Sequence, residues 1–133
     1  MEKKEPYATE EEFNQRVIRY RDIPAIEAVP GSKSHIISTE RITISFLTLP
    51  PNVSTPVHNH EHEQTMIVLD GACDAVVEGK IYHIEAGDVL LLPSNTKHGS
   101  HISDRGCRAI DIFCPPRQDF VAKLEAAKKK AQA

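Results

Sequence analysis

The chain has 133 residues, a formal net charge of −3 and three cysteines. This length fits one ordinary domain, which can bury a core without disulfides or a structural metal. Acidic and basic side chains are interspersed except at the two ends, which argues against a nucleic-acid-binding face and against a basic membrane surface. We therefore expect one soluble domain with no nucleic acid and no membrane among its partners.

The cysteines and the N-terminal sequence indicate in which cellular compartment the protein is expected. Cys73, Cys107 and Cys114 are odd in number and lack a CxxC spacing, so we expect free thiols that serve as small core residues. The stretch MEKKEPYATEEEF lacks the apolar centre of a signal peptide, and no segment reaches the length of a membrane span. These features predict a cytoplasmic protein.

The ends of the chain are predicted to be helical. Thr9 followed by Glu12 is a capping-box pattern, which predicts a short helix near residues 10–16. Phe120, Leu124 and Ala127 lie at helical spacing and predict a terminal helix over 118–130. We divide the single domain into an N-terminal arm (1–33), a β-barrel (34–116) and a C-terminal helix and tail (117–133).

The middle of the chain is predicted to be all-β. Apolar runs separated by turn residues occupy 35–39, 41–49, 65–69, 73–77, 81–84, 89–92 and 108–114. Run 41–49 alternates Ile42, Ile44 and Phe46 with polar residues, and run 89–92 is continuously apolar, which predicts burial on both of its sides. Eight or more short strands without intervening helices predict a sandwich or a closed barrel.

A histidine-rich stretch, HNHEHEQ, begins at residue 58. His58, His60, His62 and Gln64 alternate there, and a period of two sends all four side chains toward one face of an extended segment. Neutral imidazole binds zinc, nickel, iron and manganese, so this face predicts a metal site if another segment adds a donor. The alternative is a solvated turn, but strict alternation followed by an apolar run favours the metal site.

The second half of the chain supplies the additional donor, and the whole arrangement resembles the cupin family. The first cupin motif corresponds to His58, His60, Gln64 and Gly71, and the second to Gly87, Pro93 and His98. Both motifs occur in the family's order, within roughly residues 35–114. The resemblance implies a jelly-roll barrel (double-stranded β-helix) in which His58, His60, Gln64 and His98 hold one divalent metal, either Ni, Zn, Fe or Mn.

The sequence departs from the cupin pattern at several positions. Gln64 replaces the usual glutamate; an amide oxygen brings no charge, so we expect weaker metal binding and a stronger Lewis acid. Asn52 and Asn95 replace glycines, a tolerable change because asparagine adopts left-handed conformations more readily than most residues. Glu61 and Glu63 lie at odd-numbered positions, between the even-numbered His58, His60 and Gln64, and are therefore expected to face solvent or a partner strand. His62 is expected behind the ligands or at the pocket rim.

The end of the predicted barrel resembles a particular group of small cupins, the pectin degradation proteins of the KdgF type. The resemblance rests on the run from Asp111 to Arg117, on Asp119-Phe120, and on the tripeptide HEQ at 62–64. These cupins convert an unsaturated monouronate into its linear keto form. The resemblance implies Asp111, Phe113 and Arg117 as catalytic pocket residues, and a homodimer in which the segment before residue 34 is exchanged.

The chemistry of these residues agrees with that implication. Asp111 and Phe113 share one face of run 108–114, opposite Ile110 and Ile112, and that face can open into a cavity. An aspartate near a divalent cation is a natural general acid or base. Arg117 offers a planar guanidinium that can grip a carboxylate in two hydrogen bonds; the alternative is a surface charge on the first turn of the helix.

Three functional hypotheses follow. The first is a metal-dependent enzyme that opens or ketonises an unsaturated uronate and binds its carboxylate substrate without an organic cofactor. The alternatives are an Fe-dependent dioxygenase and a non-catalytic cupin that binds a small ligand. His35, His83 and His101 have no motif spacing and are expected to be structural.

Overall fold

The computed structural model describes residues 6–132, so residues 1–5 of the predicted arm and residue 133 of the predicted tail lie outside it. The elements are helix α1 (Glu10–Arg16), the 3-10 helix η1 (Tyr20–Asp22), strands β1 (Lys33–Ser38), β2 (Thr43–Leu49), β3 (Ser54–His58), β4 (Glu63–Val77), β5 (Lys80–Glu85), β6 (Val89–Leu92) and β7 (His98–Cys114), and helix α2 (Gln118–Gln132). The described chain therefore has seven strands where eight or more were predicted. The difference arises because β4 and β7, of 15 and 17 residues, each continue through positions where separate short strands were expected.

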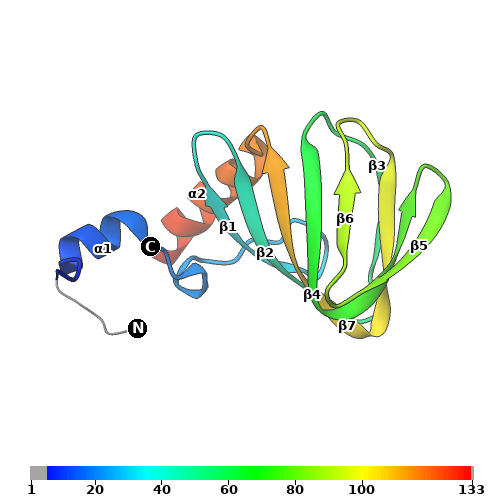
Figure 1. Cartoon of the computed structure of the whole chain (residues 1–133), viewed down its shortest axis with the longest axis horizontal. Helices are drawn as coiled ribbons and strands as arrows, with labels where there is room; N and C mark the ends of the chain where they lie inside the picture. The colour runs from blue at the N-terminus through cyan, green and yellow to red at the C-terminus, as the bar shows by residue number, and fades with distance from the viewer. Residues whose placement is uncertain (1–5, 133) are drawn as a thin grey trace.

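Strands β4 and β7 organise the barrel (Figure 1). Residues 63–70 of β4 pair with 108–114 of β7 beside β2, β1 and β6, whereas residues 71–77 pair with 98–107 beside β5 and β3. The pairing register shifts around residues 69–72, and Gly71 and Gly106 meet there with φ of 77° and 79°. A Cβ atom on Gly71 would collide with the carbonyl oxygen of Gly106, so only glycine fits this crossing.

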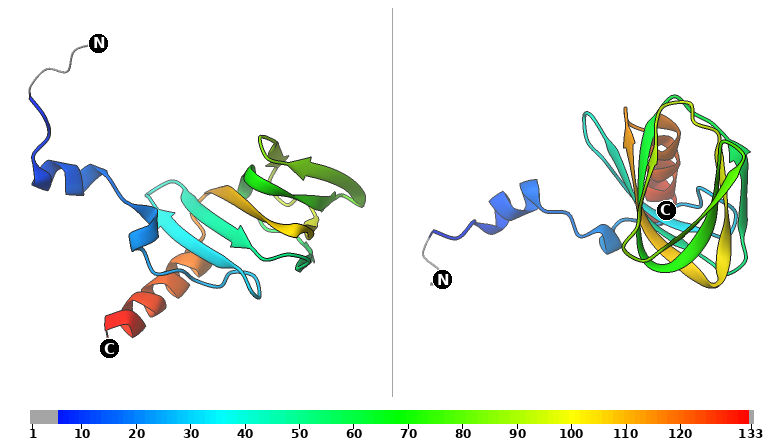
Figure 2. Two further views of the ribbon diagram at one scale, coloured as in Figure 1. Left: turned by 90° about the horizontal axis from the view of Figure 1, so that it is seen from below. Right: turned by 45° about the vertical axis from the view of Figure 1, so that its right-hand side comes forward.

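The core lies inside the barrel. Its main cluster consists of Leu47, Leu49, Met66, Val68, Cys73, Ala75, Ile84, Ile102, Cys107 and Ala109. Helix α2 packs against the inner side of β1 and β7, where Phe120 and Leu124 contact a second cluster that includes Ile36 and Phe113. The helical spacing predicted for the C-terminal segment is thus confirmed, and Figure 2 shows α2 running beneath β1.

Strands β2 and β6 each bury only one of their two faces, which contradicts the prediction that run 89–92 is buried on both of its sides. In β2, the inward face carries Thr43, Ser45, Leu47 and Leu49, while the more apolar pair Ile44 and Phe46 is half-exposed on the outside. In β6, only Leu90 and Leu92 point inward; Val89 and Leu91 are 54% and 69% exposed. A continuous apolar run therefore marks a strand with two apolar faces, of which only one meets the core.

Cysteine burial also differs in part from expectation. All three thiols are free; Cys73 and Cys107 are buried in the core, as predicted. Cys114 is exposed at the end of β7, so the core assignment is wrong for it.

Local signals in the sequence gave several correct predictions. Thr9 and Glu12 form both hydrogen bonds of the capping box at the start of α1. Asn52 and Asn95 have φ values of 63° and 64°, the left-handed conformation that the family's glycines would supply. Neither of the two α-helices between residues 6 and 132 has the length and hydrophobicity needed to span a bilayer.

Candidate metal centre

Three histidines converge where β3 ends and β7 begins. His58 ends β3, His98 begins β7, and the two residues are directly paired across these strands. His60 returns to them from the following turn, so that one ring nitrogen from each histidine lies within 4.8 Å of the others. The prediction of one extended segment is therefore wrong, because β3 ends at His58 and β4 begins at Glu63. The imidazoles nevertheless meet as expected.

Each imidazole is held by a backbone carbonyl. The Nδ1 atoms of His58, His60 and His98 lie 2.9, 3.0 and 2.8 Å from the carbonyl oxygens of Pro56, His62 and Thr96. A carbonyl accepts only from a protonated nitrogen, so these bonds place the proton on Nδ1 and leave Nε2 as the free ligand atom. Loss of solvation on burial lowers the pKa of His60 and of His98, which keeps both rings neutral at physiological pH.

Gln64 completes the donor set. Its Oε1 lies 3.1 Å from Nε2 of His60, and its side chain also forms a hydrogen bond with Asp111. Two donors at about 2.1 Å from one ion and at right angles to each other lie about 3 Å apart, so this spacing suits neighbouring ligands. Since Asp111 receives the amide N–H, the amide oxygen is left for the cation. Three imidazole nitrogens and one amide oxygen fit a divalent ion such as Zn, Ni, Fe or Mn.

Asp111 lies beside this cluster on the inner face of β7. Its neighbours across the sheet are Ser45 on β2 and Met66 on β4, and its side chain is only 7% exposed. Oδ1 has no hydrogen-bond partner among residues 6–132. Burial raises the pKa of Asp111 to about 6, and the Gln64 hydrogen bond and the Arg117 charge oppose that rise. A buried carboxyl with a raised pKa and one unpaired oxygen can exchange a proton with a ligand.

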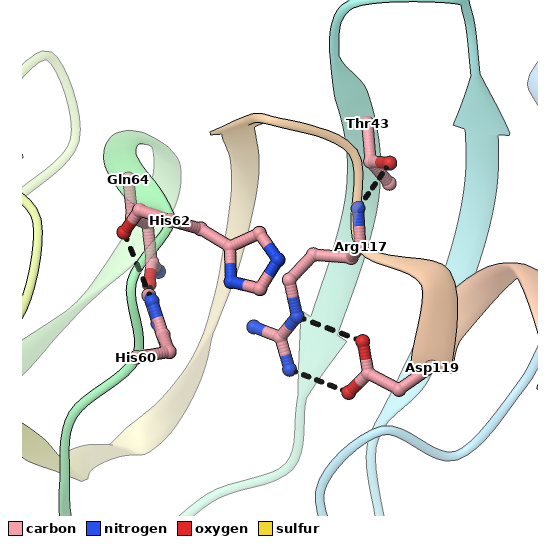
Figure 3. Close-up of polar contacts among 6 residues, drawn as sticks. All are labelled: Thr43, His60, His62, Gln64, Arg117 and Asp119. Carbon is pink, nitrogen blue, oxygen red and sulfur yellow. Dashed lines mark hydrogen bonds and ion pairs between the residues drawn. The ribbon is translucent and has the colours of Figure 1, made fainter.

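Arg117 is engaged differently from the prediction. Its Nε and Nη2 donate to the two carboxylate oxygens of Asp119, at 3.0 and 2.8 Å, so the pair of donors expected to grip a substrate carboxylate is already used. The guanidinium also packs on the rings of Phe113 and Phe120, 4.8 and 3.9 Å from their centroids. Figure 3 shows the remaining nitrogen, Nη1, on the side away from Asp119, facing His60. Arg117 can therefore offer a ligand one nitrogen of fixed direction.

The candidate metal donors and the pocket residues border one cavity of about 380 Å³. This volume is within the usual range for small-molecule pockets. Six of the seven predicted site residues line it: His58, Gln64, His98, Asp111, Phe113 and Arg117. The seventh, His60, lies beside His98 with ring centroids 5.0 Å apart and does not line the cavity. Aliphatic side chains such as Leu47, Leu90 and Leu92 line the rest of the wall.

The remaining polar residues of the turn are Glu61, His62 and Glu63. The carbonyl of His62 holds His60, and the ring of His62 packs edge-on against the His60 ring at 5.4 Å and points toward Arg117 (Figure 3). His62 thus lies behind the ligands, one of the two positions predicted for it. Glu61 and Glu63 are exposed, as their parity predicted.

The three histidines without motif spacing lie outside the cluster. The ring of His35 bonds to the carbonyl of Ile23, that of His83 to Asp74, and that of His101 to Ser54. Their hydrogen bonds are local structural contacts, in agreement with the prediction.

Asp119 is the residue whose role the sequence analysis missed. It was noted only as part of a family-like segment, and nothing in its spacing linked it to Arg117. The available signal was a carboxylate two residues after an arginine at the start of a helix, where both the helix dipole and a cation favour a negative charge. That pairing lowers the pKa of Asp119, chiefly through the hydrogen bond from Arg117.

A family model for the cupin domain matches residues 45–113, which is more than half of the chain. The chain belongs to the cupin family. This membership confirms the predicted all-β cupin fold and agrees with a histidine-based divalent metal site.

Comparison with individual proteins adds detail. The chain is 34% identical over 70 residues to the pectin degradation protein KdgF of Dickeya dadantii, a match that covers 52% of this chain and 63% of that protein. It is 29% identical over 96 residues to the endoribonuclease YbeY of Myxococcus xanthus, covering 71% of this chain but 33% of that protein. The chain therefore spans less than two thirds of either curated relative.

A solved structure extends the likeness to KdgF. The structure of KdgF from Halomonas sp. superposes with a TM-score of 0.70 at 25% identity, covering 75% of this chain and 93% of that one. The predicted resemblance to small cupins of the KdgF type is thus confirmed in both sequence and structure.

Proposed function

We propose that this cupin is a metal-dependent enzyme that opens and ketonises the ring of a small unsaturated uronate. The observation that carries the proposal is the position of Asp111, a buried carboxyl with an unpaired oxygen in the same cavity as His58, His98 and Gln64. The name of the Dickeya dadantii relative, a pectin degradation protein, supports an acidic sugar as the substrate. A divalent cation bound by the donor set would polarise a hydroxyl or carboxylate oxygen of the substrate.

The chain's own residues account for binding and proton transfer. Nη1 of Arg117 would donate to one oxygen of the substrate carboxylate, and the flat ring of Phe113 would border the sugar ring. Asp111 would accept the proton of the anomeric hydroxyl as the bond between the anomeric carbon and the ring oxygen breaks. Donation of a proton to the vinylic carbon then converts the enol to a ketone. Reactant and product are isomers, so no oxidant or second substrate is needed.

The experiment uses the metal-loaded protein and an unsaturated galacturonate. Proton NMR follows the loss of the vinylic signal and the appearance of the linear keto product. Conversion at least about a hundredfold above the buffer rate is expected, the lower end of what one positioned acid or base contributes. Conversion at the buffer rate would remove this substrate class, and tight binding without turnover would favour the non-catalytic hypothesis.

A second expectation concerns the pair formed by Arg117 and Asp119. Replacing Asp119 with asparagine removes one charge-assisted acceptor, so Arg117 loses its fixed direction and its charge is no longer balanced. We expect KM for the uronate to change by about tenfold, equivalent to about 1.4 kcal/mol, with a smaller change in kcat. Steady-state kinetics measure both constants.

The matched control for that variant is Glu125→Gln on the same helix. Glu125 is exposed, and its described ion pair is with Lys128, at 3.8 Å. Its replacement should leave both constants unchanged. Equal KM values for the wild type, Asp119→Asn and Glu125→Gln would show that the pair does not orient a substrate contact.

A further inference from the structure

The wall of the cavity carries polar side chains on three strands that lie side by side. Ser34, Ser45 and Asp111 come from β1, β2 and β7, which are neighbours in the sheet (Figure 1). Ser45 is directly paired with Asp111, and Ser34 is diagonal to Ser45 because its own direct partner is Leu47. Cβ atoms are about 5 Å apart in direct pairs and about 7 Å apart in diagonal ones. The two serines therefore extend the polar wall from Asp111 toward β1.

Ser34 carries a buried hydroxyl that the rest of the protein does not use. Its relative exposure is 0%, and its Oγ forms no hydrogen bond with any group of residues 6–132. The backbone around it is fixed, since its N–H donates to the carbonyl of Ile26 at 2.9 Å and its carbonyl accepts from the N–H of Ile26 at 2.8 Å. Buried polar groups are normally paired, so a rigidly held hydroxyl without a partner calls for an explanation.

Buried hydroxyls that do not line the cavity are paired in the usual way. Thr43 accepts a hydrogen bond from the backbone N–H of Arg117, at 2.8 Å. The hydroxyl of Ser32 donates to the carbonyl of Val29 at 2.6 Å and accepts from the N–H of the same residue at 3.0 Å. Neither Thr43 nor Ser32 lines the cavity, whereas Ser34 does. The position of the unpaired hydroxyl therefore points to a partner that enters the cavity.

The surroundings of the two serines suit a neutral hydroxyl better than a charged group. A serine hydroxyl both donates and accepts, and so does the hydroxyl of a sugar, so the two satisfy each other. The direct neighbours of Ser34 and Ser45 include the aliphatic Leu47 and Ile36, beside which a charge would be poorly solvated. Asp111, the neighbour of Ser45 on β7, would repel a carboxylate. A ligand hydroxyl meets none of these penalties.

We propose that Ser34 and Ser45 form a subsite that recognises the hydroxyl group on C2 of a sugar acid. The inference rests on the proposed function, in which Asp111 accepts the proton of the anomeric hydroxyl on C1. C2 is bonded to C1 and Ser45 is the direct neighbour of Asp111, so the hydroxyl on C2 is the next one along this wall. A site that hydrogen-bonds a ligand hydroxyl rejects an analogue without it, because the buried groups of the site then stay unpaired. The serine pair thus selects against 2-deoxy sugar acids.

Calorimetric titration of the metal-loaded protein tests the subsite without requiring turnover. The ligands are galacturonate, which has the C2 hydroxyl but no double bond, and its 2-deoxy analogue. The wild type is expected to bind galacturonate about tenfold more tightly than the analogue. In the double variant Ser34→Ala and Ser45→Ala, the ratio of the two affinities should fall to about one. Equal affinities in the wild type, a tenfold ratio that persists in the double variant, or no binding of galacturonate would each overturn the proposal.

The titration and the turnover assay separate the two proposals. Conversion of the unsaturated uronate by a protein that binds both titration ligands equally would overturn the subsite alone. Selective binding of galacturonate that depends on the serine pair, in a protein without turnover, would support the subsite and remove the enzymatic proposal.

Ser32→Ala is the matched control for the serine pair. Ser32 is also buried, but its hydroxyl is paired with Val29 and does not line the cavity. This control should keep the tenfold ratio and lower Tm, because it loses hydrogen bonds made within the protein. Ser34→Ala should leave Tm unchanged or raise it, because its hydroxyl has no partner to lose. A lower Tm in Ser34→Ala would show that the hydroxyl has a structural role, and would overturn the proposal.

Discussion

Replacing Asp111 with asparagine is expected to lower turnover of the unsaturated uronate by roughly 10²–10⁴-fold, the range for loss of a positioned acid or base. Asparagine has nearly the same shape, and its oxygen can still accept the hydrogen bond from Gln64, so the cavity and the metal donors remain in place. The variant loses only the ability to take up and release a proton. Turnover and metal content, measured on the same preparation, separate these effects.

The same substitution is expected to stabilise the metal-free protein above pH 6. Burial raises the pKa of Asp111 from 3.8 to about 6, so the folded protein holds this proton more tightly than the unfolded chain does. Stability contributed by the wild-type side chain is therefore lost as pH rises through the interval between these values. Above about pH 6, the buried charge lowers the free energy of unfolding by up to about 3 kcal/mol. Asparagine carries no charge, so the variant avoids this loss.

Thermal or urea unfolding at pH 4 and at pH 8 measures this effect. The difference in stability between Asp111→Asn and the wild type should be near zero at pH 4 and positive at pH 8. Asp104→Asn, a change at an exposed position, should show no such difference. Unchanged turnover in Asp111→Asn would contradict the proposed proton transfer, whereas equal stabilities at pH 8 would contradict the described burial.

Replacing His98 with alanine is expected to weaken divalent metal binding by at least about a hundredfold. Loss of a residue that merely orients a ligand costs roughly 10–100-fold in affinity, and His98 is placed to be a ligand itself. It is also the most buried of the three imidazoles, and its pairing with His58 ties β3 to β7. Competition with a chromophoric chelator, using Zn²⁺ and Ni²⁺ separately, gives the affinities.

His101→Ala is the matched control for this measurement. His101 lies three residues further along β7, is exposed, and bonds only to Ser54 among the hydrogen bonds described for its ring. Metal affinity in this variant should equal that of the wild type. If the His98 and His101 variants bound metal equally well, the three-histidine cluster would not be the metal site.

Sequence patterns that act over short distances predicted well. The capping box at Thr9, the left-handed asparagines and the apolar stripe of Phe120 and Leu124 all depend on neighbours within a few residues. The convergence of His58, His60 and His98 was also predictable, because two motifs with fixed internal spacing determine which strand ends must meet. The shared inner face of Asp111 and Phe113 followed from the two-residue period of a strand.

The sequence by itself therefore determined which histidines meet, the turns, the helix ends and the alternation of each strand. Only the tertiary structure decided which side of β2 and β6 faces the core, since a period of two defines two faces but not what packs on them. It likewise decided that Asp119 occupies the paired nitrogens of Arg117, because that contact depends on the turn into α2. Burial, and with it the raised pKa of Asp111, arises from contacts between distant segments that no local pattern records.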